Sequence, residues 1–426
     1  MAGARQWLRT AAFLVLALYC VVEALPRRPH ELRVRRMGSK VAEVRRLVEL
    51  GVVSTASNVQ VPLLGNQTLM GEYYIEFTVG TPPQPFSAQF DTGSADLAIP
   101  SVSCSVSSCG QHADAFYNPS ASSTAQAMSC HPSGGITCSS CQSGNCMFQL
   151  AYMDGTGFTA QLYEDQCTLG GASFSQAVGA ITVEVTNGYP FEPYAVDGIV
   201  GFAYRSCSAV NAPTMMDNLV AEGYDDVFSM CAGMNGGALT VGGIGGYHSG
   251  SIQYTPIIDE YFYTVYITDM LVRGQSIGVG PNVFNAGGAV VDSGTTDLIM
   301  PYAAYDGITN VVKNDCSRHY LSGTCDVDSR FSIWQGYCYT LSAQEVAAYP
   351  DITIVFDGGV QVDIKPQNYL VQGYCLDESL YAIAIDPAPG YYGTIMGDTF
   401  MRNVETVFDR ANARVGFAPV HNCPSA

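Results

Sequence analysis

The feature that most constrains the fold of this chain is a motif that occurs twice, 201 residues apart. Residues 88–94 read Ala-Gln-Phe-Asp-Thr-Gly-Ser, and residues 289–295 read Ala-Val-Val-Asp-Ser-Gly-Thr. A second echo follows, with Gly-Ile-Val-Gly at 198–201 and Thr-Ile-Met-Gly at 394–397. The lag from the Asp to the last Gly is 110 residues in the first half and 105 in the second. Two ordered echoes with nearly equal lags indicate two homologous lobes, which also accounts for a length of 426 residues.

The pattern from about residue 71 onward predicts a mostly β fold, because runs rich in Val, Ile and Tyr alternate with Gly, Pro, Asn and Asp. The expected strands cover residues 73–79, 87–90, 180–185, 238–241, 262–267, 289–291 and 352–356, and the few expected helices cover 214–222, 301–313 and 343–348. We expect an N-terminal lobe over residues 59–245 and a C-terminal lobe over residues 246–426.

Each copy of the repeat places an aspartate after apolar strand residues, where Gly permits a tight turn and nearby hydroxyls can bind the carboxylate. A single Asp-Thr-Gly is more often a turn, but two copies in two lobes can bring Asp91 and Asp292 face to face. Two carboxyl groups about 3 Å apart share a proton, which gives one low and one raised pKa. One can then act as a base toward water and the other as an acid toward a carbonyl oxygen. This pair would hydrolyse an amide without a metal or another cofactor.

These segments resemble the signatures of the pepsin-like aspartic proteases (peptidase family A1). The matching residues are 91–94, 292–296, 196–204, 408–412 and 415–418. The resemblance covers about residues 60–423 and implies a bilobal pepsin-like acid protease fold, with a cleft and a flap between two β-rich lobes.

The resemblance also implies roles for individual residues. Asp91 and Asp292 would be the catalytic pair, and Ser94 and Thr295 would hold their outer oxygens. Gly93 and Gly294 would support the floor of the cleft. The flap would include Tyr152, Asp154 and Gly155, and substrate would be contacted by Gln89, Ile199 and Thr296. Two positions depart from pepsins. Ala98 stands where many pepsins have the Trp that binds the flap tyrosine, and β-secretases also have Ala there. Gln89 stands where pepsins usually have an apolar residue that lines the main specificity pocket.

The chain has 15 cysteines, of which Cys20 lies in the predicted signal, so 14 remain and seven disulfides are the natural number in an oxidising compartment. A zinc ribbon at Cys138-Ser-Ser-Cys141 is the less favoured interpretation. The resemblance to β-secretases implies that Cys231 bonds to Cys423 and Cys338 to Cys375. The resemblance to pepsins implies a small loop bridge between Cys104 and Cys109. Cys316 and Cys325 are a reasonable local pair. The cysteines at 130–146 resemble insertions of nepenthesins and plasmepsin V-like enzymes, and their pairing stays open.

The N-terminal part has the opposite charge to the rest. Residues 1–24 resemble a secretory signal, cleaved after Ala24, with an apolar run too short for a retained anchor. Residues 25–58 form a basic leader, whereas residues 71–426 carry 34 acidic and nine basic side chains, a net charge of −25. An acidic body disfavours nucleic-acid binding and suits acidic surroundings. Asn66-Gln67-Thr68 is a glycosylation sequon.

The leading hypothesis is therefore a secreted or vacuolar/lysosomal aspartic endopeptidase, made as a zymogen and active at acidic pH. Its partners would be polypeptide substrates, pepstatin-like inhibitors and its own prosegment, in which Lys40 would contact both aspartates. The mature form would be a monomer without a membrane anchor. Two alternatives are an inactive pepsin-like binding protein and a specific processing protease active near neutral pH.

Overall fold

The computed structural model describes residues 58–66, 71–104, 106–110, 112, 114–152, 155–185, 197–375 and 379–425. The predicted signal, nearly all of the basic leader with Lys40, and flap residue Asp154 lie outside the described residues. Within this part of the chain, no helix is both long enough and apolar enough to cross a membrane.

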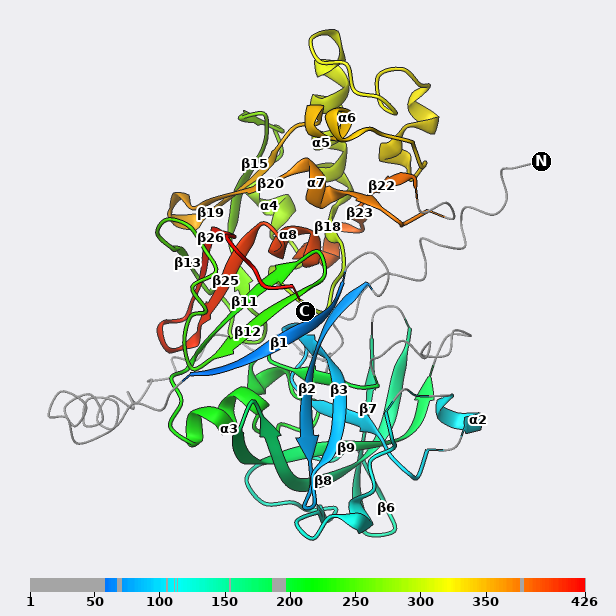
Figure 1. Cartoon of the computed structure of the whole chain (residues 1–426), viewed down its shortest axis with the longest axis vertical. Helices are drawn as coiled ribbons and strands as arrows, with labels where there is room; N and C mark the ends of the chain where they lie inside the picture. Colours follow the sequence, from blue (N-terminus) through cyan, green and yellow to red (C-terminus); the bar gives the residue numbers. More distant parts are fainter. Residues whose placement is uncertain are drawn as a thin grey trace, which may run out of the picture.

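The molecule is built mostly from strands that form two lobes (Figure 1). The first lobe holds β1 (Val59–Asn66), β2 (Glu72–Val79), β3 (Gln84–Asp91), β4 (Leu97–Pro100), β5 (Gln126–Ala127), β6 (Ser140–Gln142), β7 (Asn145–Ala151), β8 (Gly157–Leu169), β9 (Ala172–Val185), β10 (Ile199–Gly201), β11 (Val227–Gly233) and β12 (Gly236–Val241). The second holds β13 (Gln253–Pro256), β14 (Thr264–Val265), β15 (Ile267–Val272), β16 (Gln275–Ser276), β17 (Ala289–Val291), β18 (Leu298–Pro301), β19 (Ile352–Phe356), β20 (Gln361–Ile364), β21 (Leu370–Gln372), β22 (Tyr381–Ile383), β23 (Ile385–Ala388), β24 (Thr394–Met396), β25 (Val404–Asp409) and β26 (Arg414–Pro419).

The helices span four to 13 residues each and are few beside the strands (Figure 1). They are α2 (Val106–Cys109), α3 (Met215–Ala221), α4 (Pro281–Phe284), α5 (Tyr302–Asn314), α6 (Ala343–Ala348), α7 (Pro366–Tyr369) and α8 (Asp398–Met401). Local sequence explains where two of them start, since Thr214 with Asp217 and Ser342 with Glu345 form capping boxes at α3 and α6.

The two lobes repeat one strand topology around the two motifs. In the first lobe β3 pairs in parallel with β10, β10 pairs antiparallel with β4, and β4 pairs in parallel with β9. In the second lobe β17, β24, β18 and β23 repeat the same three pairings in the same order. The internal repeat is therefore a repeat of structure, and each motif follows or ends the strand at the same place in its lobe.

A sheet formed by both halves of the chain joins the lobes. In it, β25 pairs with β11 and β26, β11 pairs with β12, and β12 pairs with β1, which runs between the lobes in Figure 1. Buried aromatic rings lie at this junction. Phe228 of β11 stacks on Phe408 of β25 at 4.5 Å and contacts Phe90, Phe202 and Tyr263. Since Phe90 precedes Asp91, this cluster supports the end of β3 from the interior.

The expected elements agree closely with the structure at 289–291, 352–356 and 343–348. The expected strand over 262–267 was wrong in part. Phe262 and Tyr263 lie in a turn before the two-residue strand β14, and the longer strand β15 begins only at Ile267. Both turn residues are nevertheless buried, so their apolar pattern reports packing rather than strand geometry.

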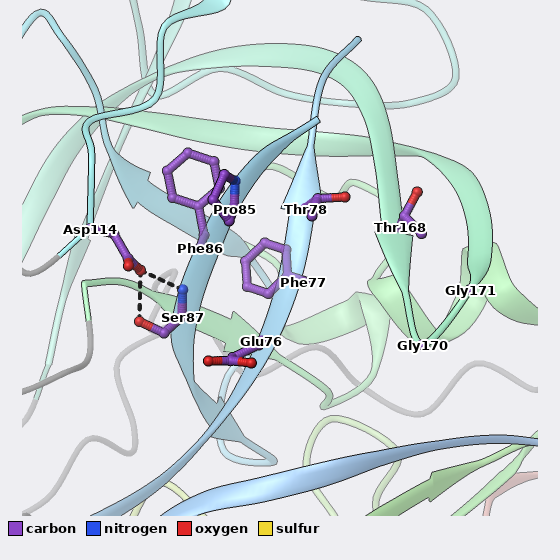
Figure 2. Close-up of a pocket in the computed structure, with 10 residues that line it drawn as sticks. All are labelled: Glu76, Phe77, Thr78, Pro85, Phe86, Ser87, Asp114, Thr168, Gly170 and Gly171. Carbon is purple, nitrogen blue, oxygen red and sulfur yellow. Dashed lines mark hydrogen bonds between the residues drawn. The ribbon is translucent and has the colours of Figure 1, made fainter. Parts of the chain in front are cut away.

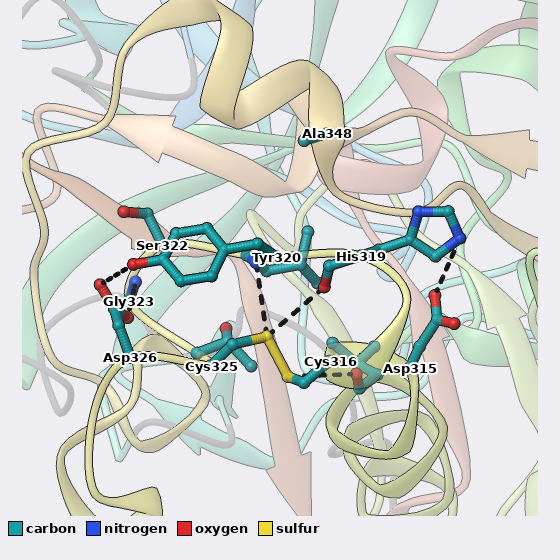
Figure 3. Close-up of a disulfide and its surroundings, with 12 residues drawn as sticks. Asp315, Cys316, His319, Tyr320, Ser322, Gly323, Cys325, Asp326 and Ala348 are labelled. Carbon is teal, nitrogen blue, oxygen red and sulfur yellow. Dashed lines mark hydrogen bonds and ion pairs between the residues drawn. A yellow bond between two sulfur atoms is a disulfide. The ribbon is translucent and has the colours of Figure 1, made fainter.

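Six disulfides lie within the described residues. Four join the expected pairs, Cys104–Cys109, Cys231–Cys423, Cys316–Cys325 and Cys338–Cys375, and two resolve the open cluster, Cys130–Cys141 and Cys138–Cys146. Figure 3 shows Cys316–Cys325, which closes a loop after α5 beside an ion pair between Asp315 and His319 at 3.8 Å.

The expectation of seven disulfides was wrong. The two remaining cysteines, Cys167 and Cys207, do not bond to each other, because they are buried in different places. Cys167 lies in β8 within the main core, and Cys207 packs near Ala203 and Phe262. An even number of cysteines does not show that the last two lie close together, and a disulfide forms only where the two Cβ atoms are about 4 Å apart. Asn66 ends β1, and the rest of its sequon lies outside the described residues.

Candidate active site

Asp91 and Asp292 occupy corresponding positions at the carboxyl ends of β3 and β17. Asp91 lies opposite Gly201 of β10, and its carbonyl accepts a hydrogen bond from the amide of Phe202 at 2.7 Å. The amide of Asp292 donates to Met396 at 3.1 Å. The last six residues of β3 are buried, because β3 lies between β2 and β10. Central strands in both lobes therefore carry the two carboxyl groups to the lobe boundary.

Each carboxyl group is held by donors from its own motif. The amide of Gly93 donates to Asp91 Oδ1 at 2.7 Å, and the Ser94 hydroxyl donates to Asp91 Oδ2. The second lobe repeats this pattern. The amide of Gly294 donates to Asp292 Oδ1 at 2.9 Å, and the hydroxyl of Thr295 donates to Asp292 Oδ2 at 2.6 Å.

The two carboxyl groups also meet across the lobe boundary. A Cβ atom added to Gly93 would lie 2.5 Å from Asp292 Oδ1, so the first motif contacts the second carboxylate directly. Besides burial, the charge of Asp292 raises the pKa of Asp91, so the two carboxyl groups titrate as a pair.

Burial dominates the protonation of this pair, since both side chains have no exposed surface. It raises the pKa of Asp91 well above its usual value, with the charge of Asp292 as the next cause. Burial also raises the pKa of Asp292, to about 6, although the Thr295 and Gly294 hydrogen bonds lower it. Both pKa values are thus raised in this buried state, because burial outweighs the donors.

A pair of hydroxyl groups that was not predicted joins the two motifs to each other. The amide of Ser293 donates to Thr92 Oγ1 at 2.9 Å, and the amide of Thr92 donates to Ser293 Oγ at 3.1 Å. The Thr92 hydroxyl then donates to the carbonyl of Val291, and the Ser293 hydroxyl donates to that of Phe90. The signal was present, because both copies of the repeat have a hydroxyl residue directly after the aspartate.

The predicted flap is a hairpin between β7 and β8. Ala151 lies opposite Gly157, and the amide of Tyr152 donates to the carbonyl of Thr156 at 2.8 Å. Gly155 closes the turn with φ of +83°, a conformation that favours glycine. Tyr152 is buried, and its ring lies 6.2 Å from that of Phe158.

The other predicted contact residues lie around the two motifs. Gln89 is buried, and its amide donates to the carbonyl of Gly294 at 3.4 Å, so it bridges the lobes. Ile199 and Ala98 belong to the same buried cluster as Tyr152. The Thr296 hydroxyl donates to the carbonyl of Gly71 at the start of β2.

A shallow cavity of about 400 Å³ lies elsewhere on the first lobe (Figure 2). Its lining includes Glu76, Pro85 and Phe86, together with Asp114, which accepts hydrogen bonds from the amide and hydroxyl of Ser87 at 2.6 and 2.7 Å. Neither Asp91 nor Asp292 lines it. The cavity is thus distinct from the candidate active site.

A two-lobed β fold that holds two aspartates together at the ends of equivalent strands defines a pepsin-like protein. The family model described as eukaryotic aspartyl protease matches residues 72–133 and 135–420, and the chain belongs to this family. It is 31% identical over 372 residues to pepsin A of Sus scrofa, covering 84% of this chain and 85% of that protein. It is 32% identical over 359 residues to pepsin A of Canis lupus familiaris, covering 82% of this chain and 81% of that protein. A beta-secretase of Strongylocentrotus purpuratus is 28% identical over 394 residues, which cover 83% of this chain and 67% of that protein.

Proposed function

We propose that the chain is an aspartic endopeptidase that hydrolyses peptide bonds with Asp91 and Asp292 as its catalytic pair. The observation that carries this proposal is the meeting of the two motifs, in which Gly93 packs directly against the Asp292 carboxyl group and each carboxyl group is held by its own glycine amide and hydroxyl. Asp292 would take a proton from a water molecule, and protonated Asp91 would donate its proton to the substrate carbonyl oxygen. The hydroxide attacks the carbonyl carbon to form a gem-diol. Asp292 then gives the proton that it took to the amide nitrogen, ionised Asp91 takes a proton from one hydroxyl of the gem-diol, and the C–N bond breaks to release a carboxylic acid and an amine.

We propose acidic activity for this enzyme. The support is the charge of residues 71–426, whose net −25 makes the folded body lose self-repulsion as its carboxylates protonate in acid. One observation favours the second candidate, a processing protease active near neutral pH. With the pKa of Asp292 at about 6 and that of Asp91 higher, the singly protonated pair persists above the acidic range.

The remaining proposals concern the life of the protein before catalysis. A signal at residues 1–24 would direct it to the secretory pathway, and the basic leader at residues 25–58 would bind the acidic cleft as an inhibitory prosegment until acid weakens the attraction. Lys40 would contact both aspartates. The mature enzyme would be a secreted or vacuolar/lysosomal monomer that carries a glycan on Asn66.

The test is hydrolysis of denatured haemoglobin by the secreted, processed protein from about pH 3 to pH 7.5, with and without pepstatin. We expect pepstatin-sensitive cleavage with a maximum below pH 5, and none by the Asp292→Asn variant. A maximum near pH 7 with a narrow set of cleavage sites would favour the processing protease. Absence of cleavage by folded, processed protein would favour a binding function.

A further inference from the structure

Four further carboxyl groups lie on segments that converge on the second motif, and the mechanism above uses none of them. Asp297 follows the second motif, Asp386 lies in β23, Asp398 begins α8 and Glu72 begins β2. They come from four segments that are distant in sequence. The charges of Asp292, Asp297 and Glu72 all act on Asp398, so the fold brings acidic side chains of these segments into one neighbourhood.

Hydrogen bonds and close packing bring these segments together. The Thr296 hydroxyl bonds to the carbonyl of Gly71, which places the start of β2 against the second motif. Gly397, just before Asp398, packs so closely on the backbone of Asp297 that a Cβ there would clash with the Asp297 carbonyl oxygen. β18 and β23 run in parallel, with Leu298 opposite Ile385. This register sets Asp386 opposite Ile299, two residues along the chain from Asp297, so Asp297 and Asp386 point to the same face of the sheet.

The carboxyl groups of Asp297 and Asp386 interact, because Asp297 lowers the pKa of Asp386 against the larger effect of burial. The hydroxyl of Tyr374 also donates to Asp297 Oδ1 at 2.9 Å. Asp386 is half-buried, and burial raises its pKa to about 6. Two adjacent carboxyl groups in such a place repel each other once both are ionised, and a cation between them removes that repulsion.

Asp398 gives an independent indication that the cluster accepts a ligand. Its side chain has no exposed surface, and neither of its carboxyl oxygens has a hydrogen-bond partner. Burial raises its pKa, Arg402 lowers it, and the negative charges of Asp292, Asp297 and Glu72 raise it further. Arg402 is thus the one cation that lowers the pKa of Asp398, whereas three carboxylates raise it. A buried carboxylate without donors is costly, and an added donor or cation relieves that cost.

Glu72 extends the cluster toward the first lobe. Its side chain is half-buried, and its protein surroundings raise its pKa to about 8. A bound metal ion is a poor explanation for these groups, because the described residues contain no group of three or more His, Cys, Asp or Glu side chains placed to hold one. A long side chain with a terminal cation can reach such a cluster while its backbone stays at the lobe boundary.

We infer that Asp297, Asp386, Asp398 and Glu72 form a subsite for a lysine or arginine side chain of the substrate, close to the bond that is cut. The inference rests on the proposed peptidase function. The Asp297 and Asp386 carboxyl groups can accept a guanidinium or ammonium group, and the bound cation offsets the burial that raises the pKa values of Asp386 and Asp398, so that both ionise when it binds. The enzyme then prefers peptides with a basic residue at one fixed position near the scissile bond, in addition to any apolar preference.

The test uses the processed enzyme and peptides built around a cleavage site mapped in a denatured protein. Each of the four positions on either side of the scissile bond is occupied in turn by Lys, Arg, norleucine or citrulline. The last two keep the length of the basic side chains but remove their charge. We expect kcat/KM for Lys and Arg to exceed that for their neutral counterparts about tenfold or more at one position, the ratio that one net charge-assisted contact gives.

The variants Asp386→Asn and Asp297→Asn/Asp386→Asn are expected to reduce that ratio to below about threefold. The ratio is measured within one preparation, so a partly folded variant still reports it, and the half-buried Asp386 offers a mild single change. The matched control is Asp225→Asn, which removes an exposed carboxylate outside the cluster and should keep the ratio. Equal cleavage of charged and neutral peptides, or an unchanged ratio in the double variant, would overturn the subsite and leave the peptidase proposal intact. No cleavage of any peptide would overturn both.

Discussion

At the scale of single residues, the donors on the two aspartates decide the pH range in which the pair can work. The Thr295 hydroxyl bonds to Asp292 Oδ2 at 2.6 Å and lowers the pKa of that carboxyl group against the effect of burial. Thr295→Ala removes the bond and therefore raises the pKa of Asp292. Because Asp292 must be ionised to take a proton from water, activity at low pH is lost first.

We expect Thr295→Ala to move the acidic limb of kcat/KM upward by about one pH unit, since a hydrogen bond to a charged group is worth roughly 1.5–3 kcal/mol. Thr295→Ser keeps the hydroxyl and should keep the profile. A pH profile of kcat/KM for all three proteins checks this. An acidic limb that does not move in Thr295→Ala would show that the hydroxyl does not tune Asp292.

A second residue-scale prediction concerns Gly93. Its φ is not in the left-handed region, so backbone strain is not the issue. A methyl group there would lie 2.5 Å from Asp292 Oδ1 and would push the two carboxyl groups apart. We expect Gly93→Ala to reduce kcat by a factor of about 100 or more, as small misplacements of catalytic groups do, with a smaller change in KM.

The control for Gly93→Ala is Gly280→Ala, because a Cβ at Gly280 meets nothing within 4 Å. That variant should match the parent in kcat. Full activity of Gly93→Ala would mean that the contact between the first motif and Asp292 is dispensable.

At the scale of elements, the hairpin of β7 and β8 is the predicted flap, which we propose covers the substrate. Gly157 lies opposite Ala151, and a Cβ at Gly157 would clash with the Leu150 carbonyl oxygen. We expect Gly157→Ala to spread the hairpin at its tip and to lower kcat/KM about tenfold or more, through a strain of roughly 1–3 kcal/mol.

The matching control lies at the other end of β8, in the turn to β9. Gly171 has φ of +93° but open space around it, so Gly171→Ala strains a turn without touching the flap hairpin. Peptide hydrolysis and thermal unfolding of both variants separate the two effects. Loss of activity in Gly171→Ala equal to that in Gly157→Ala would attribute both to stability rather than to the flap.

The elements also show which parts of the site could be read from sequence. Asp91, Asp292 and their glycine and hydroxyl donors were predictable, because each set lies within four consecutive residues and the repeat placed the two sets at equivalent points. Strand edges were less predictable at Phe262 and Tyr263, where burial gives the same apolar pattern as a strand.

Features formed by tertiary packing gave no local signal. Glu72, Asp386 and Asp398 meet Asp297 only because β2, β23 and α8 converge on the second motif. No spacing between these residues reports that convergence. Counting cysteines failed for the same reason, because Cys167 and Cys207 are distant in space and each packs as a small apolar side chain.

At the scale of the whole molecule, buried acidic groups make the folded state depend on pH in one direction. Burial raises the pKa values of Asp292 and Asp386 to about 6 and that of Glu72 to about 8, so the native state binds more protons than the unfolded chain between about pH 4 and pH 8. Burial lowers the pKa of His112, but hydrogen bonds with Asp197 and Glu184 outweigh it and raise the pKa to about 10.

These shifts all have the same sign with respect to stability. A carboxyl group with a raised pKa stabilises the fold while it is protonated, and this contribution is lost as the pH rises from its unfolded value near 4 to its folded value. His112 stabilises the fold below about pH 6.5, and its contribution is lost as the pH approaches 10. The net charge of −25 on residues 71–426 adds repulsion as the carboxyl groups ionise. The folded protein should therefore be more stable at pH 4 than at pH 7.5.

Urea unfolding of the Asp292→Asn variant at pH 4 and pH 7.5 measures this without self-digestion. We expect the free energy of unfolding to fall by several kcal/mol between the two, since each group loses about 1.4 kcal/mol per pH unit within its window. Adding Asp386→Asn should reduce the fall in the free energy of unfolding between pH 4 and pH 6. Adding Asp225→Asn, at an exposed residue, should leave that fall unchanged. Equal or greater stability at pH 7.5 would contradict the argument, because it would require the buried carboxyl groups to be ionised and well paired in the folded state.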